Sequence, residues 1–139
     1  MRIPRALYDE IVAHALQDAP NECCGMIAAR DGEAVAVHRT ANTENSPFRY
    51  QMDAMEQYRV QTAIEDAGQE LGAIYHSHTR SDPVPSQTDV NLAFMPKTDQ
   101  LAWPGTLYVI VGVGGDEPQM RAWRIHEDRR YTEVELEVV

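Results

Sequence analysis

The sequence predicts a single-domain α/β fold over residues 1–139, with one mixed β-sheet flanked by helices. Segments with helical periodicity alternate along the chain with short apolar, strand-like runs, and this order is typical of α/β proteins. A chain of this length can bury one sizeable core without help from disulfides. No internal repeat, low-complexity tract or linker divides the sequence into two parts.

The first predicted element is a helix over residues 4–17, because apolar side chains recur every four positions from Leu7 to Ala15. A β-hairpin follows, since Asp31 and Gly32 form a strong signal for a tight turn between two strands. The two strands of this hairpin are predicted over residues 23–29 and 33–39.

A second helix is predicted over residues 53–69. Asp53 can cap its start, and Glu56 three positions later completes a pair that resembles a capping box. The neighbouring elements are a polar loop, a buried strand and a short third helix, predicted over residues 40–52, 71–76 and 86–95.

The last third of the chain predicts an antiparallel part of the sheet. Glycines and an aspartate at positions 114–116 form a turn signal between two β-forming runs. Near the end, three glutamates alternate with apolar residues, which is the pattern of one half-exposed strand. The strands are predicted over residues 107–113, 119–126 and 131–138.

The charge of the chain argues against nucleic acid as a partner. Lys and Arg total 12 against 22 Asp and Glu, which gives a formal net charge of -10. Such a surface repels phosphate backbones, so general nucleic-acid binding is not expected. The acidic residues are spread along the chain, as in a solubilising surface or one adapted to a salty cytoplasm.

The expected location is the cytoplasm. No apolar run approaches the roughly 20 residues needed to span a membrane, and the first residues lack the pattern of a secretory signal. The two cysteines, Cys23 and Cys24, are adjacent, and neighbouring cysteines rarely meet the geometry of a disulfide. Reduced thiols in a reducing compartment are therefore expected.

The most informative pattern begins with His76 and His78 at the end of a strand. Side chains at alternate positions share a face, so both imidazoles point the same way and can converge on one metal ion. A carboxylate from the next helix can add a third ligand, and three ligands leave the open position of a catalytic zinc site. Each part of the pattern also has an ordinary explanation. His76 and His78 can be polar residues at a strand end, and Ser86 and Asp89 can form a capping box at the start of the next helix.

Together, the spacing His-Ser-His, seven residues, Ser-x-x-Asp resembles the signature of the JAMM (MPN+, Mov34/PAD-1) metallopeptidases. The family signature also has a glutamate before an apolar strand, and Glu22 in the run Asn21-Glu22-Cys23-Cys24-Gly25 matches it. Residues 42–50 and 103–108 are similar to the same regions of small bacterial members. The sequence departs from many members at Thr79, where they carry proline; this position is not a ligand.

The resemblance implies a JAMM/MPN, cytidine-deaminase-like architecture and a role for each matched residue. His76, His78 and Asp89 would bind Zn2+, with water as the fourth ligand. Glu22 would be the general acid and base, and Ser86 would stabilise the oxyanion. The zinc deaminases also pair a glutamate with zinc, but their H-x-E and P-C-x-x-C motifs are missing from this sequence.

The implied substrate is a ubiquitin-like sulfur carrier protein that ends in Gly-Gly. The resemblance favours members that release cysteine from the carrier during cysteine biosynthesis. A deubiquitinase-like or general peptide-trimming metalloprotease is the alternative, and a scaffold without activity is a third interpretation. The residue types also allow a cysteine nucleophile paired with a histidine, but Cys23 and Cys24 lie in an apolar, strand-like run, which favours buried packing.

Overall fold

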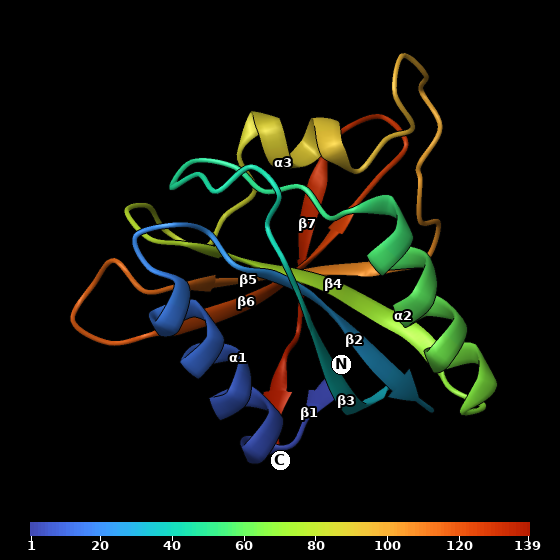
Figure 1. Ribbon diagram of the computed structural model, residues 1–139, viewed down its shortest axis with the longest axis horizontal. Helices are drawn as coiled ribbons and strands as arrows, with labels where there is room; N and C mark the ends of the chain where they lie inside the picture. Colours follow the sequence, from blue (N-terminus) through green and yellow to red (C-terminus); the bar gives the residue numbers. More distant parts are fainter.

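The computed structural model describes residues 1–139 as three helices and eight strands (Figure 1). The helices are α1 (Arg5–Asp18), α2 (Ala54–Asp66) and α3 (Gln87–Leu92). The strands are β1 (Arg2–Ile3), β2 (Cys24–Arg30), β3 (Glu33–Thr40), β4 (Glu70–His78), β5 (Leu107–Gly112), β6 (Gln119–Ile125), β7 (Tyr131–Val134) and β8 (Glu137–Val138). None of the helices is long and apolar enough to cross a membrane.

All eight strands form one mixed sheet in the order β7-β6-β5-β4-β2-β3-β1-β8. The central strand β4 runs antiparallel to β2 and parallel to β5, so it is paired on both sides. His76 of β4 lies opposite Cys24 on one side and Ile110 on the other. The predicted mixed sheet flanked by helices is therefore confirmed, and its centre holds the two histidines.

The predicted strand over residues 131–138 is wrong, because this segment forms two strands at opposite edges of the sheet. β7 pairs with β6, whereas β8 pairs with β1, and only Glu135 and Leu136 lie between them. Three residue steps span at most about 10 Å, so the sheet must curl until its two edges come close. Alternation of polar and apolar residues tells which face a side chain occupies but not which strand is its neighbour.

The two faces of the sheet carry separate apolar clusters. Residues of β2 and β4 alternate between them, so Tyr75 packs on the α1 side and Ile74 on the α2 side. Helices α1 and α2 lie on different sides of the central strands in Figure 1. His76 follows the alternation of Ile74, which places it on the α2 face.

The helix boundaries show where local patterns suffice and where they do not. Asp53 caps α2 by accepting a hydrogen bond from the backbone N–H of Glu56, as predicted. The Glu56 carboxylate, however, accepts from the backbone N–H of Ala41, so the reciprocal half of the box is not formed. Helix α3 ends at Leu92, shorter than predicted, because Phe94 then forms a β-bridge with Leu101.

Candidate metal centre

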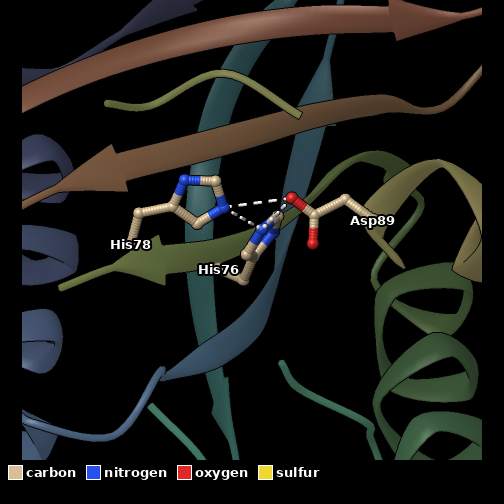
Figure 2. Close-up of side chains that lie close together, drawn as sticks. All are labelled: His76, His78 and Asp89. Atoms are coloured by element: carbon tan, nitrogen blue, oxygen red, sulfur yellow. Dashed lines mark hydrogen bonds and ion pairs between the residues drawn. The ribbon is translucent and has the colours of Figure 1, made fainter. Parts of the chain in front are cut away.

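The site is built at the carboxyl end of β4, which continues to His78, two residues beyond the strand predicted from sequence. The period of the strand turns His76 and His78 to the same face, and Asp89 reaches them from the first turn of α3 (Figure 2). All three side chains are buried. The spacing of the three residues can be recognised in the sequence, but the contact between β4 and α3 that brings them together depends on the tertiary structure.

The three ligand atoms form a small triangle. His76 Nε2 and His78 Nε2 lie 3.2 Å apart, and each lies 3.1 Å and 3.0 Å, respectively, from Asp89 Oδ2. Around a tetrahedral zinc ion with ligands at about 2.0–2.1 Å, neighbouring ligand atoms are roughly 3.3 Å apart. The triangle therefore fits one face of such a tetrahedron, and the three side chains are placed so that they could hold one metal ion.

Electrostatics favours the metal-binding ionisation states of Asp89 and His76 but not that of His78. Burial would raise the pKa of Asp89, but the charge of His76 and hydrogen bonds from both histidines hold it well below its ordinary value. Burial lowers the pKa of His76 despite the carboxylate beside it. Burial acts on His78 in the same direction, but hydrogen bonds to Asp89 and to the Asp82 carbonyl raise its pKa overall.

Ser86 holds the Asp89 carboxylate in place through a capping box. The backbone N–H of Ser86 donates to Asp89 Oδ2 at 2.9 Å, and the backbone N–H of Asp89 donates to Ser86 Oγ at 3.1 Å. Ser86 and Asp89 thus form the capping box that their spacing predicts, and the same Asp89 carboxylate also faces the two histidines. Because Ser86 Oγ accepts here, its own hydrogen is available for donation.

Glu22 lies just before β2, buried, and its Oε1 has no hydrogen-bond partner. Burial raises the pKa of this carboxyl to about 8, and the charges of His78 and Asp89 also act on it. The fold therefore brings Glu22 into the electrostatic surroundings of the ligands, although more than fifty residues separate them in sequence. A buried carboxyl that keeps a proton near neutral pH can give or take that proton.

Asn42 and Tyr50 are two residues around the site to which the sequence assigned no role. The amide of Asn42 makes four hydrogen bonds: its Nδ2 donates to the carbonyls of Glu22 and Arg49, and its Oδ1 accepts from two backbone N–H groups of the same loop. The ring of Tyr50 stacks on the imidazole of His76. Both lie in residues 42–50, the segment that looked familiar from small bacterial proteins.

A cavity of about 270 Å³ adjoins the metal centre and shares the Tyr50 ring with it. Trp103 lines this cavity together with Phe94 and Tyr108. Nine of its twelve lining residues are hydrophobic, so it is a predominantly apolar space beside the site.

The cysteines and two other histidines, His14 and His126, are not part of the group of possible metal ligands. Cys23 and Cys24 are free and fully buried, and burial raises the pKa of their thiols to about 12 and about 11. Such thiols are not activated nucleophiles. His14 contacts the Tyr75 hydroxyl under α1, and His126 contacts Thr132 at the end of β6, so neither joins the metal site.

Comparison with known proteins agrees with this geometry. Residues 4–126 match the family described as prokaryotic homologs of the JAB domain. The chain is 37% identical over 136 residues to a CysO-cysteine peptidase of Mycobacterium tuberculosis, covering 96% of this chain and 87% of that protein. A desampylase of Haloferax volcanii is 36% identical over 115 residues, covering 77% and 76% of the two chains.

A solved structure shows the same fold. The solution structure of a Desulfitobacterium hafniense protein superimposes with a TM-score of 0.83 at 28% identity, covering all of this chain and 93% of that one. The matched family model, the relatives and the His-His-Asp site lead to one conclusion. This chain belongs to the prokaryotic JAB-domain (JAMM/MPN) family.

Proposed function

We propose that this protein is a zinc-dependent peptidase that cleaves after the C-terminal Gly-Gly of a ubiquitin-like sulfur carrier protein and thereby releases cysteine. One observation carries the proposal: an open three-ligand metal site lies close to the buried, unpaired carboxyl of Glu22. The chain that builds this site is 37% identical to a CysO-cysteine peptidase over nearly its whole length.

His76, His78 and Asp89 would hold the zinc ion. Two imidazoles and one carboxylate are a donor set that zinc accepts, and a set of three leaves one position open, as in catalytic sites. When bound, zinc supplies Lewis acidity that polarises the scissile carbonyl. The neutral state of His76, which burial favours, presents a lone pair for this purpose.

Glu22 would move the proton. Its carboxylate takes a proton from the attacking water as the water oxygen bonds to the carbonyl carbon. It then gives that proton to the leaving amine as the carbon–nitrogen bond breaks. The absence of a hydrogen-bond partner at Oε1 supports this role, because that oxygen is free to take the proton from the water.

Ser86 would steady the carbonyl oxygen as it gains negative charge. Its Oγ already accepts from the backbone of Asp89, so the hydroxyl hydrogen is free to donate to the oxyanion. Donors of this kind are worth about 2.7–4 kcal/mol in other hydrolases.

The nature of the substrate rests on the relatives. One relative is named a CysO-cysteine peptidase and another a desampylase, so we take an isopeptide bond as the second candidate. A Gly-Gly tail suits either, because residues without side chains can thread a narrow channel to the metal. The two buried, free cysteines support the proposed cytoplasmic location, since that compartment keeps thiols reduced.

The test compares two substrates built on the same carrier, one joined to cysteine and one joined to a lysine side chain. We expect purified protein to contain near-stoichiometric zinc and to cleave the cysteine adduct faster, with turnover lost on chelation and restored by zinc. Faster cleavage of the lysine adduct would favour the isopeptidase. Carrier binding without cleavage of either substrate, with zinc present, would make the protein a scaffold.

Two variants test the roles of Glu22 and His78, and a third variant is their control. Glu22→Gln should keep zinc and lose turnover by about 10²–10⁴-fold, the usual contribution of general acid–base catalysis. His78→Ala should lose the metal as well. Glu44→Gln makes the same chemical change at an exposed position and should behave as wild type. Near-normal turnover in Glu22→Gln would remove Glu22 from the mechanism.

A further inference from the structure

The two histidine ligands are held by different means. His78 Nδ1 donates to the carbonyl oxygen of Asp82 at 2.8 Å, which turns its Nε2 toward the other ligands. His76 Nδ1 is also buried, but it has no hydrogen-bond partner. Histidines that bind metals are almost always oriented by a hydrogen bond at their second nitrogen. His76 lacks this support, so something else must orient its ring.

The aromatic ring of Tyr50 fills that place. The Tyr50 and His76 ring centroids lie 4.4 Å apart with an angle of 22° between the planes, which is a stacked pair. His76 is only 1% exposed and Tyr50 7% exposed, so the contact is enclosed. A ring stacked in this way cannot rotate about its χ2 angle without clashing, and the direction of Nε2 is thereby fixed.

Tyr50 is itself anchored, although it lies in the long loop between β3 and α2. Its two neighbours in sequence are both tied to one buried side chain: Asn42 Nδ2 donates to the Arg49 carbonyl, and Asn42 Oδ1 accepts from the Gln51 backbone N–H. The peptide units on either side of Tyr50 are therefore fixed, and its ring has a defined position against His76.

We propose that Tyr50 is a positioning residue for the metal ligand His76. Its stacked ring orients His76, as the hydrogen bond to the Asp82 carbonyl orients His78. This rests on the metal site of the proposed function but not on the peptidase reaction. The competing explanation is that Tyr50 is only a core residue, since it belongs to the apolar cluster on the α2 face. The two explanations differ in what happens to metal affinity.

Tyr108 provides the matched control. It is the same residue type, belongs to the same cluster, lines the same cavity and is similarly buried, at 6% exposed. Its ring is not stacked on either histidine. Tyr108→Leu and Tyr50→Leu should therefore lower the melting temperature to a similar extent, while only the second should disturb the metal.

The experiment measures zinc affinity of the full-length chain by competition with a chromophoric chelator, together with the visible absorption of the Co(II)-loaded protein. We expect Tyr50→Leu to bind zinc about 10–100-fold more weakly, the usual loss when a supporting partner is removed, and to change the cobalt spectrum. Tyr50→Phe should restore both to wild-type values, because the ring is kept. Tyr108→Leu should leave both unchanged.

Two outcomes would overturn the proposal. Wild-type zinc affinity and spectrum in Tyr50→Leu would show that the stack does not position His76. Equal losses in Tyr50→Leu and Tyr108→Leu would show a general packing effect. If Tyr50→Leu does not fold, Tyr50→Met, which keeps a long apolar side chain without a ring, takes its place with the same expectations. Tight zinc binding without any peptidase activity would refute the proposed function and leave this proposal standing.

Discussion

Raising the pH from 5 to 8.5 should destabilise the metal-free protein chiefly through Glu22. In the unfolded chain this carboxyl has its ordinary pKa of 4.5, whereas burial raises the pKa to about 8 in the folded protein. Between these values the folded state binds more protons than the unfolded state, so the free energy of unfolding falls as pH rises. The stabilising contribution is complete below pH 4.5 and is lost as pH passes through 8.

The size of the effect follows from the two pKa values. At 1.36 kcal/mol per pH unit, the gap between 4.5 and about 8 corresponds to roughly 5 kcal/mol. Most of this, about 3–4 kcal/mol, falls between pH 5 and pH 8.5. It is a large fraction of the roughly 5–15 kcal/mol that stabilises a typical domain.

The assay is urea denaturation of chelator-treated wild type and Glu22→Gln at pH 5 and at pH 8.5. Other groups titrate over this range, so the informative quantity is the difference in unfolding free energy between the two proteins. That difference should shift in favour of Glu22→Gln by about 3–4 kcal/mol at the higher pH. The exposed Glu44→Gln is the control, and its difference from wild type should be equal at both values. A Glu22→Gln difference that stays constant within about 1 kcal/mol would refute the reasoning.

Three further predictions test other parts of the structure. A Cβ at Gly25 would overlap the Tyr75 ring, so Gly25→Ala should cost about 1–3 kcal/mol in urea denaturation. Gly115→Ala, with open space around it, should cost far less, and equal losses would contradict the packing argument. Ser86→Ala should lose about 1 kcal/mol of stability with the helix cap and about 10²–10³-fold in kcat with the oxyanion donor. Unchanged kcat would remove that second role. Because burial raises the pKa of both cysteines, Ellman's reagent at pH 8 should react at least about 100-fold more slowly with folded than with urea-unfolded protein. Rapid labelling of the native state would show that the thiols are accessible.

Local patterns in the sequence were enough to predict many elements of the fold. The four-residue spacing in the first helix, the Asp31-Gly32 turn and the Asp53 cap each depend on residues close in sequence, and the structure confirms all three. The shared direction of His76 and His78 could also be predicted from nearby residues, because alternate residues of a strand lie on the same face.

Features that depend on distant contacts were not predictable in this way. The segment 131–138 alternates without interruption, yet its halves pair with different strands. The nearness of Glu22 to the ligands followed only from the family resemblance, since no local pattern joins β2 to α3. The stacking of Tyr50 on His76 could not be predicted from residue spacing, because Tyr50 lies in a loop and loops have no regular repeat that fixes the direction of a side chain.

The amide of Asn42 has a consequence for which substitutions the chain can tolerate. All four of its bonding positions are used, and they join the backbone of Glu22 to the loop that carries Tyr50. No other side chain reproduces this arrangement: aspartate has the shape without the donors, leucine has the shape without polarity, and glutamine is one methylene too long. Many apolar positions in the core of the sheet would tolerate substitution by another hydrophobic residue of similar volume. At position 42 every substitution would break some of these hydrogen bonds, and Glu22 would then lose its connection to the loop that carries Tyr50 while the strands stayed paired.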